Sequence, residues 1–335
     1  MALKILFAFY PLFVDWNHGI ALLSQLCKNR GIETELYILR SPSRFYEYLQ
    51  DTNYDYVCFS STIRPDLIEL EQYIIVAECA GHKILLGGTH FSLFKEFKHK
   101  HPVCLGDGET LPDFLLNGDD SLFKKKLVCK DINSLPLPDY ELFDGIKFNR
   151  KVEGYSKIVP YVSSRGCSEH CSFCQIRYQP PGVRIRFKMG EELSYLKERY
   201  NPDLFWILDA TPPYFSSNWR ISWGEFRHDF VCYIRGNIKP HELEFMIDRG
   251  MKVCLVGFES GNERYRNEVL KKNLTDEEIW RTVDILKKHN VVFVPFFMNK
   301  TPGETPEIAT ETISMANKMN APGLLWEYKE LISCQ

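Results

Sequence analysis

The sequence predicts an α/β protein with two domains, an open doubly wound sheet followed by a partial barrel. The chain has 335 residues, more than the roughly 250–300 at which a single hydrophobic core stops growing. Short apolar segments alternate with helical patterns along most of the chain, which is typical of parallel sheets covered by helices on both faces. This alternation stops once, in a proline-rich stretch. We therefore expect a first domain over 1–118, a linker over 119–158 and a second domain over 159–335.

In the first domain, each predicted strand is a short apolar run. The predicted helix over Gly19–Asn29 carries apolar residues at helical spacing and ends before Gly31. Pro65 suits the first turn of a second helix, over about 65–80. The strands are predicted over Lys4–Tyr10, Thr34–Leu39, Tyr56–Ser61, Lys83–Gly88 and Val103–Gly106. Such apolar strands separated by helices indicate a Rossmann-like domain.

The second domain repeats the alternation six times. Thr275 and Glu278 form a capping box that begins its third helix. The strands are predicted over Val159–Ser163, Leu204–Asp209, Phe230–Ile234, Lys252–Phe258, Val291–Met298 and Gly323–Glu327. The helices between them are predicted over Gly190–Tyr200, Pro240–Arg249, Thr275–His289 and Pro306–Asn320. Six strand–helix repeats predict a partial (β/α)6 barrel.

The composition limits the class of protein. Hydrophobic residues make up 44% and charged residues 25%, as in an ordinary globular enzyme. The net charge of −3 gives no basic field for nucleic acid, and no apolar run reaches the roughly 20 residues that cross a bilayer. The first residues lack the features of a signal peptide, and the 11 cysteines are irregularly spaced. We expect a protein of the reducing cytoplasm, with neither a nucleic-acid nor a membrane partner.

The strongest chemical signal is a cysteine triplet directly after the first strand of the second domain. Cys167, Cys171 and Cys174 place three thiolates in one short loop, at the rim where barrels carry their active sites. Thiolates are the ligands of iron–sulfur clusters and of zinc. A zinc site usually has four ligands, whereas no second cysteine pair is present and His170 would be a poorly oriented fourth ligand. We favour a 4Fe–4S cluster with one open iron over zinc or chance clustering.

The Cys-x-x-x-Cys-x-x-Cys spacing, with the aromatic Phe173 before the last cysteine, resembles the signature of the radical S-adenosylmethionine (radical SAM) superfamily. The resemblance implies that the three cysteines ligate a 4Fe–4S cluster whose open iron binds SAM. It also implies that an electron from the cluster cleaves SAM, and that the resulting radical abstracts hydrogen from an unreactive carbon. The cofactors carry this chemistry, and the protein positions them.

Further segments of the second domain fit this resemblance. The segment Val256–Gly261 resembles the family's Gly-Ile-Glu-Ser-Gly segment, although it could also be a plain strand-to-loop turn. Asp209 ends the second strand and could bind the substrate amine or the cofactor, and Arg235 ends the third and could pair with the cofactor carboxylate; each could equally form a surface salt bridge. Thr301–Thr305 matches the family's Pro-Gly-Glu-Thr turn and is expected to be structural. The residues expected to bind SAM are Phe173, Asp209, Arg235, Glu259 and Ser260.

The first domain resembles the cobalamin-binding domain that is fused to many radical SAM enzymes. Small residues follow its third, fourth and fifth strands, Leu-Pro-Asp-Tyr lies in the linker, and the absence of Gly-x-Gly-x-x-Gly disfavours a dinucleotide. His18 has the wrong spacing for a cobalt-ligating loop and is expected to start a helix. The residues expected to line the cobalamin cleft are Ser60, Ser61, Thr62, Gly87, Gly88, His90, Gly106 and Gly108. The expected cofactors are thus a 4Fe–4S cluster, SAM and cobalamin.

These features lead to one principal hypothesis and two alternatives. The principal hypothesis is a cobalamin-dependent radical SAM methyltransferase acting on an unactivated carbon of a natural-product or peptide substrate, with an electron donor such as flavodoxin or ferredoxin. The first alternative is radical rearrangement, cyclisation or ring contraction, with or without cobalamin. The second alternative is a non-catalytic cobalamin or iron–sulfur sensor. The mass of the product distinguishes the methyltransferase from the first alternative, because methylation adds one methyl group, rearrangement adds no mass and cyclisation removes hydrogens. A sensor, unlike either enzyme, would form no 5′-deoxyadenosine from SAM.

Overall fold

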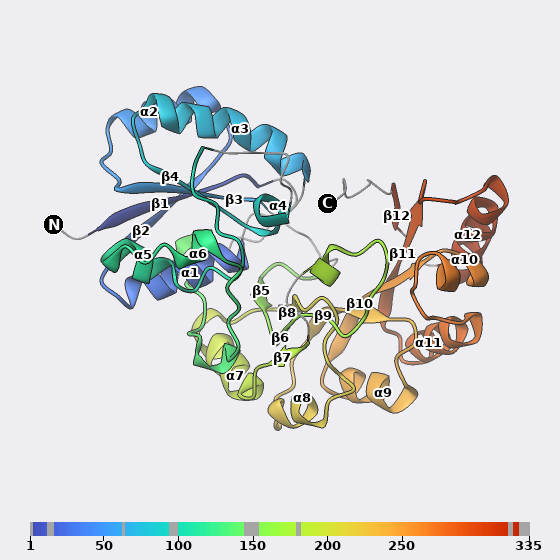
Figure 1. The fold of residues 1–335 in the computed structure, drawn as a ribbon. Helices are drawn as coiled ribbons and strands as arrows, with labels where there is room; N and C mark the ends of the chain where they lie inside the picture. The colour runs from blue at the N-terminus through green and yellow to red at the C-terminus, as the bar shows by residue number, and fades with distance from the viewer. Residues whose placement is uncertain are drawn as a thin grey trace. The chain divides into compact units, whose positions relative to one another are not determined.

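The computed structural model describes residues 3–11, 17–61, 64–93, 100–143, 154–178, 182–320 and 324–327. The chain divides into two compact units: Met1–Ser156 with Ile332–Gln335, and Lys157–Leu331. Each unit contains its own parallel sheet (Figure 1). The predicted α/β fold class is confirmed. Within the described residues, no helix is both long enough and apolar enough to span a bilayer.

The sheet of the first unit has four parallel strands in the order β2-β1-β3-β4. Beyond β4, Val103 adds one parallel bridge to Leu86. This is the doubly wound order 2-1-3-4-5, in which the chain reverses direction across the sheet between β1 and β3. The strands are β1 (Lys4–Phe9), β2 (Glu33–Ile38), β3 (Tyr56–Ser60) and β4 (Ile84–Gly87).

Helices cover both faces of this sheet: α2 and α3 lie on one face, and α1 and α5 on the other (Figure 1). On the first face, Phe45 and Leu49 of α2 join a buried apolar cluster with Leu70 of α3 and strand residues that include Leu6. The helices are α1 (His18–Lys28), α2 (Pro42–Gln50), α3 (Arg64–Cys79), α4 (Thr89–Leu93), α5 (Leu111–Asn117) and α6 (Ser121–Lys124), with short 3-10 turns η1 (Ile132–Ser134) and η2 (Tyr140–Phe143).

Several elements of this unit differ from the sequence prediction, in which helices α2, α4, α5 and α6 are all missing. Helix α2 is absent from the prediction, although Phe45, Tyr48 and Leu49 have the i, i+3, i+4 spacing of an apolar helix face. The predicted strand Val103–Gly106 is reduced to the single bridge at Val103. After that bridge, the amides of Leu105 and Asp107 donate to the carbonyls of Leu122 and Leu127, both at 3.0 Å, so the chain leaves the sheet.

The segment predicted as a linker packs against α1 where the structure describes it. The buried Asp139 carboxylate accepts hydrogen bonds from Ser24 Oγ and Lys28 Nζ, each at 2.7 Å. The backbone amide of Asp139 donates to the carbonyl of Ala21 at 2.9 Å. His18 begins α1, and its Nδ1 lies 3.2 Å from the Tyr140 hydroxyl. The Leu-Pro-Asp-Tyr segment therefore anchors this part of the chain on the first unit.

The second unit has six parallel strands arranged in chain order, β12-β11-β10-β9-β8-β5, with β12 and β5 at the two edges. Helices α9, α11 and α12 lie on its outer side (Figure 1). This is the predicted partial (β/α)6 barrel. The strands are β5 (Ile158–Tyr161), β8 (Leu204–Ile207), β9 (Phe230–Arg235), β10 (Met251–Glu259), β11 (Val292–Asn299) and β12 (Leu324–Glu327). The helices are α7 (Met189–Tyr200), α8 (Ser217–Ser222), α9 (Pro240–Asp248), α10 (Glu263–Glu268), α11 (Asp276–Lys288) and α12 (Pro306–Met319), with the 3-10 turn η3 (Gln175–Tyr178).

The strand register of the barrel gathers polar residues at its carboxyl edge. Gly257 pairs with Arg235 on one side and with Phe296 on the other, so these three positions share one face. Asp209 follows the end of β8, and Glu259 ends β10. The chain leaves β5 at the same edge and enters the cysteine segment. The sequence-predicted residues thus reach one rim because parallel strands end there together.

Candidate active site

The cysteine loop begins in a short antiparallel pair that sequence patterns do not reveal. Strands β6 (Ser164–Arg165) and β7 (Arg184–Ile185) pair Arg165 with Arg184. Between them, Gly166 has a φ of 91°, and a Cβ added to it would lie 2.2 Å from the carbonyl oxygen of Gly182. No other residue type fits this approach without strain. Gly166 therefore lets the two ends of the loop close immediately before Cys167.

Asp209 stabilises the start of this loop through four hydrogen bonds with Ser163 and Ser164. Its Oδ1 accepts hydrogen bonds from the backbone amides of Ser163 and Ser164, at 2.7 and 3.0 Å. Its Oδ2 accepts from both serine hydroxyls, with Ser164 Oγ at 2.6 Å. Trp219 Nε1 donates to Ser163 Oγ at 2.7 Å. Asp209 was expected either to contact a cofactor or to form a salt bridge; here its carboxylate binds the loop.

Burial and hydrogen bonding act on the Asp209 carboxyl in opposite directions. Burial disfavours the charged form and raises the pKa of Asp209 to about 6, although the four hydrogen bonds from Ser163 and Ser164 lower it. The group is nevertheless largely ionised at neutral pH, so all four bonds can be accepted by the carboxylate. The physical function of Asp209 in this structure is to hold the backbone that leads to the cysteines.

The three cysteines differ in exposure. The side chain of Cys171 is buried, whereas Cys167 and Cys174 are half-buried. The amide of Cys174 donates to the carbonyl of Cys171 at 3.2 Å, which forms a turn across the last two thiols. Among the residues that the structure describes, no three His, Cys, Asp or Glu side chains converge closely enough to hold a single metal ion. Ligands of a multinuclear cluster bind different irons, so they do not need to converge on one point.

Arg235, at the end of β9, points its guanidinium at the cysteine loop. Its Nη1 lies 3.6 Å from Cys171 Sγ, and its Nη2 lies 3.4 Å from the carboxylate of Glu169 in the same loop. Nη2 also donates to the backbone carbonyl of Lys272. The side chain is almost fully buried. Arg235 is thus placed beside a predicted cluster ligand.

Glu259 lies at the rim in a conformation that is rare for its residue type. Its φ is 70°, and the strand register shifts between Gly257 and Glu259. Its Oε1 is 2.7 Å from Lys272 Nζ, and the Lys272 ammonium lies 5.8 Å from the centre of the Phe173 ring. Two expected SAM ligands, Phe173 and Glu259, are therefore brought together through a lysine that sequence analysis missed. In the sequence, Lys271 and Lys272 look like an ordinary solvated pair.

Two segments singled out in the sequence make mainly internal contacts. The hydroxyl of Ser260 lies 3.2 Å from Thr312 Oγ1 and accepts from the amide of Asn262 at 3.2 Å. In the Pro-Gly-Glu-Thr turn, Thr301 Oγ1 lies 2.6 Å from the Tyr265 hydroxyl. The Thr305 hydroxyl accepts from the amide of Ile308 and caps α12. These contacts fit the structural role expected for the Thr301–Thr305 turn.

In the first unit, Ser60, Ser61, Gly87 and Gly88 lie at the carboxyl ends of β3 and β4, and Gly106 and Gly108 follow the bridge at Val103. Ser60 ends β3, and the amide of the buried Ser61 donates to the carbonyl of Gly87 at 3.1 Å. Thr62 lies outside the described residues. His90 falls within α4, and nothing is described of its side chain. This edge flanks the β1/β3 switch point, where doubly wound sheets bind ligands.

The four predicted glycines of this edge are not equivalent. A Cβ on Gly88 would lie 2.2 Å from the carbonyl oxygen of Ser61, and one on Gly106 would lie 2.2 Å from that of Leu127. The protein's own backbone therefore requires glycine at these two positions. A Cβ on Gly87 or Gly108 would meet only ordinary contacts, at 3.8 and 3.4 Å. At Gly87 and Gly108 a methyl group would therefore fit without a clash.

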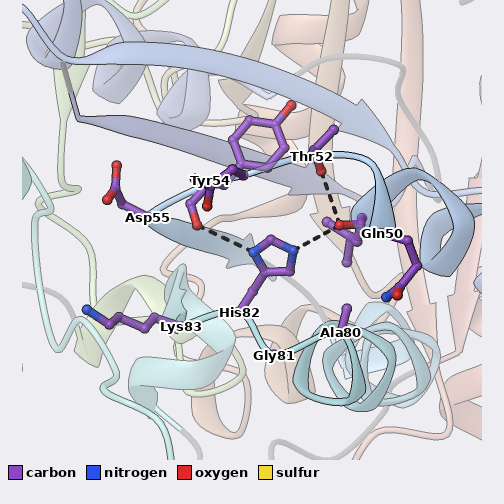
Figure 2. Close-up of a pocket in the computed structure, with 10 residues that line it drawn as sticks. Gln50, Thr52, Tyr54, Asp55, Ala80, Gly81, His82 and Lys83 are labelled. Atoms are coloured by element: carbon purple, nitrogen blue, oxygen red, sulfur yellow. Dashed lines mark hydrogen bonds between the residues drawn. The ribbon is translucent and has the colours of Figure 1, made fainter. Parts of the chain in front are cut away.

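A separate open pocket lies at the opposite, amino edge of the same sheet, before β3 and β4 (Figure 2). His82 lies within it, with Nε2 3.2 Å from the carbonyl of Leu49 and Nδ1 3.4 Å from that of Tyr54. Asp55 and Lys83 lie at its sides (Figure 2). The pocket is far along the strands from the switch point and contains none of the predicted site residues.

Comparison with known proteins assigns the second unit to a family. Residues 161–316 match the model of the radical SAM superfamily. No curated protein sequence matches the chain. Two solved structures of TsrM, a radical S-adenosylmethionine methyltransferase from Kitasatospora setae, match nearly the whole chain. The one with cobalamin and a [4Fe-4S] cluster bound has a TM-score of 0.74 and 14% identity, covering 98% of this chain and 72% of TsrM.

The second TsrM structure, with tryptophan substrate and the SAM analogue aza-SAM bound, has a TM-score of 0.73 and 15% identity and covers 96% of this chain and 72% of TsrM. At this level of identity the likeness concerns the fold, and it extends over both units. The family model covers the segment that contains the three cysteines, Asp209, Arg235 and Glu259. Residues 161–316 are therefore similar to the radical SAM superfamily, and this match covers slightly less than half of the chain.

Proposed function

We propose that this protein is a cobalamin-dependent radical SAM methyltransferase that acts on an unactivated carbon of a natural-product or peptide substrate. In this proposal Cys167, Cys171 and Cys174 hold a 4Fe–4S cluster. The observation that carries the proposal is the fixed cysteine loop: Asp209 fastens its start, and Arg235 lies 3.6 Å from the thiol of Cys171. The likeness to TsrM over both units, rather than over the barrel alone, favours cobalamin and methyl transfer among radical SAM reactions.

The residues of the loop fit an iron–sulfur cluster. Three thiols within eight residues provide the soft ligands that such clusters need, and leave one iron for another ligand. The Arg235 guanidinium provides positive charge and an N–H donor beside the Cys171 sulfur. Hydrogen bonds to ligand sulfurs are among the factors that set the reduction potential of a cluster. The chain therefore supplies ligands and electrostatics suited to a low-potential cluster.

The chain's own residues then have distinct roles at the barrel rim. When bound, the cluster and SAM would supply the electron and the radical, and cobalamin would supply the methyl group. Glu259, with its carboxylate at the end of β10, would accept hydrogen bonds from the ribose hydroxyls of SAM. Phe173 would offer a flat apolar surface beside the cluster. Asp209 and Ser260, whose side chains bind the protein itself, would position the loops rather than contact SAM directly.

The first unit would hold cobalamin at the carboxyl edge of its sheet. Ser60 and Ser61 offer hydroxyl groups next to the β1/β3 switch point, and Gly87 and Gly108 leave room for a bulky ligand. Gly88 and Gly106 would shape this edge without touching the ligand. Thr62 and His90 remain proposed contacts from the sequence alone.

The proposed partners and location follow from this chemistry. The substrate would be a small molecule or a peptide, and a flavodoxin or ferredoxin would deliver electrons. All ten cysteines that the structure describes are free thiols. Free thiols together with an iron–sulfur cluster require a reducing compartment, which favours the cytoplasm.

Anaerobic purification with added hydroxocobalamin tests this function. We expect a corrinoid absorption band that co-elutes with the protein in a one-to-one ratio, and about four irons per chain. Incubation with SAM and a reductant should then yield 5′-deoxyadenosine and, with a peptide or natural-product library, products heavier by one methyl group. Products of unchanged mass would instead indicate rearrangement. A protein that retains no corrinoid after desalting would contradict the cobalamin part of the proposal.

A further inference from the structure

Lys272 is a buried cation that the proposed function leaves without a role. It lies four residues beyond the end of α10, and only 6% of its surface is exposed. Its ammonium is 2.7 Å from Glu259 Oε1 and 5.8 Å from the centre of the Phe173 ring. A buried lysine pays a desolvation cost that only close partners offset. Here the partners are one rim carboxylate and one aromatic ring of the cysteine loop.

The pair formed by Lys272 and Glu259 lies over a glycine of β10. A Cβ on Gly257 would lie 2.4 Å from Glu259 Oε1 and 2.9 Å from Lys272 Nζ. Gly257 is in register with Arg235 and Phe296, so the pair shares one face of the sheet with the guanidinium that contacts Cys171. The glycine two residues before Glu259 is therefore explained: it makes space for the Glu259 carboxylate to fold back over the strand.

The segment that carries Lys272 also binds the cysteine loop through its backbone. The carbonyl of Leu270 accepts from the amide of Ser172 at 3.0 Å, and that of Val269 accepts from the Ser172 hydroxyl at 2.8 Å. The carbonyl of Lys272 itself accepts from Arg235. We call residues 269–272 the brace. It joins the cysteine loop, β9 and β10 at a single place.

Arg266 links the brace to its surroundings: the carbonyl of Arg266 accepts from the amide of Lys272 at 3.0 Å, and its side chain binds residues on either side of the brace. The guanidinium of the fully buried Arg266 donates to the carbonyls of Leu274 and Ser260, at 2.8 and 2.7 Å, and to Asp276 Oδ1 at 2.6 Å. Lys271 has a φ of 53°, a left-handed conformation that non-glycine residues adopt only when their surroundings enforce it. Such strain concentrates at functional sites, where it fixes a side chain in one orientation.

We propose that Lys272 is a positioning residue of the radical site: it holds the Glu259 carboxylate against the Phe173 side of the cysteine loop, so that the loop and the carboxylate form one preorganised surface. This inference rests on the proposed function, in which Glu259 binds SAM beside the cluster. Lys272 need not touch substrate or cofactor. It acts through Glu259 and Phe173, the two groups that its ammonium contacts.

Three single substitutions separate this role from a general effect on folding. Lys272→Met removes the charge and keeps the length of the side chain, and Lys272→Arg restores the charge. Lys271→Met is the matched control, because Lys271 is the neighbouring lysine with an exposed side chain. Iron and sulfide content, SAM affinity and hydrogen exchange of residues 167–174 in the cluster-free protein are measured for each. The last readout does not depend on activity.

We expect Lys272→Met to retain the iron content of the wild type and to weaken SAM binding by about 10–100-fold, as loss of an outer-shell partner does. The amide of Ser172 should exchange faster in this variant. Lys272→Arg should bind SAM within about threefold of the wild type, because the charge is restored. Lys271→Met should match the wild type in all readouts. Equal SAM affinity and equal exchange in Lys272→Met and the wild type would overturn the inference.

The double variant Lys272→Met with Glu259→Gln covers the case in which the single variant does not fold, because it removes both charges of the buried pair. If Lys272 acts through Glu259, the double variant should bind SAM no more weakly than Glu259→Gln alone. If the double variant bound SAM about tenfold more weakly than Glu259→Gln, the inference that Lys272 acts through Glu259 would be wrong. If the wild-type protein itself bound neither iron nor SAM, the proposed function would fail, and this outcome is distinct from a failure confined to Lys272.

Discussion

The barrel rim of the second unit and the carboxyl edge of the first unit are both predicted ligand sites, but they are built differently. At the barrel rim, side chains from β9, β10, the cysteine loop and the brace contact one another, and the buried groups Asp209, Arg235, Glu259 and Lys272 all have partners within the protein. At the edge of the first sheet, two of the four predicted glycines are fixed by the backbone of Ser61 and Leu127. Only Gly87 and Gly108 leave room at that edge.

The two sites therefore depend on different features of the sequence. The barrel rim is preorganised by charged and hydrogen-bonded networks, so a single substitution there should change cofactor binding and the stability of the loop together. The edge of the first sheet is specified by shape, so substitutions there should separate the two effects. Substituting a glycine that the backbone needs should affect stability, and substituting a glycine at which a methyl group fits should affect ligand binding.

The largest effect is expected for Asp209. Asp209→Ala leaves two backbone amides and two hydroxyls of Ser163 and Ser164 without their acceptor, and each orphaned buried donor costs about 1–3 kcal/mol. We expect a loss of roughly 3–5 kcal/mol in the free energy of unfolding and low iron content. Asp209→Asn should cost only about 1–2 kcal/mol, because its amide oxygen still accepts and the serine hydroxyls can turn to accept from its NH2 group.

Urea unfolding of the cluster-free protein measures these losses. Asp203→Asn is the matched control, since Asp203 accepts the backbone amide of Lys157 at an exposed site, at 2.9 Å, near the amino end of β8. It should change stability by less than about 0.5 kcal/mol. If Asp209→Ala proved as mild as this control, the account of a fastened cysteine loop would be wrong.

A smaller effect should separate the glycines of the first unit. Gly88→Ala meets the Ser61 carbonyl and must adopt a φ of 95°, so we expect a loss of about 2–4 kcal/mol. Gly87→Ala has space for its methyl group and should cost less than about 1 kcal/mol, yet it should reduce retention of cobalamin. Thermal unfolding and corrinoid absorbance after desalting give the two values. If Gly87→Ala lowered the thermal stability and left cobalamin retention unchanged, the proposed difference between the two sites would be wrong.

The smallest effect concerns Arg235. Arg235→Gln removes a positive charge beside Cys171 and weakens the N–H contact to its sulfur, and both changes disfavour the more negative reduced cluster. If the contact is worth about 1.4 kcal/mol more in the reduced state, the midpoint potential should fall by roughly 60 mV. A redox titration followed by electron paramagnetic resonance measures the shift. Arg235→Lys should retain most of the potential, and an unchanged potential in Arg235→Gln would limit Arg235 to binding Glu169 or SAM.

Much of the fold could be predicted from the sequence because its strands are continuous apolar runs with clear breaks between them. All six barrel strands lie where the apolar runs predict them, and the capping box at Thr275 and Glu278 is present. Prediction failed where local pattern was weak or tertiary contacts decided. Helix α2 has two buried residues, β6 and β7 have two residues each, and Val103 makes only one bridge. The β6, β7 and Val103 segments are too short to have a periodicity, whereas α2 is missing from the prediction although Phe45, Tyr48 and Leu49 lie at helical spacing.

The sequence could predict only those site residues whose type and spacing are themselves typical of a cofactor site. The cysteine triplet, Glu259 and Arg235 stand at strand ends, so their convergence follows from a parallel barrel. Lys272 could not be predicted, because its burial depends on the missing side chain of Gly257 and on its amide donating to the carbonyl of Arg266 at 3.0 Å. Likewise, the sequence cannot show whether a glycine faces a ligand or its own backbone. Gly88 and Gly106 have the second role.

The central claim is that three thiols of one loop hold a cluster that cleaves SAM. Its most direct test compares the anaerobically reconstituted wild type with a variant in which Cys167, Cys171 and Cys174 are all alanine. The account predicts about four irons and four sulfides per wild-type chain, with 5′-deoxyadenosine formed from SAM after reduction, and neither cluster nor product in the variant. Tightly held zinc without sulfide in the wild type, or equal 5′-deoxyadenosine from both proteins, would contradict it.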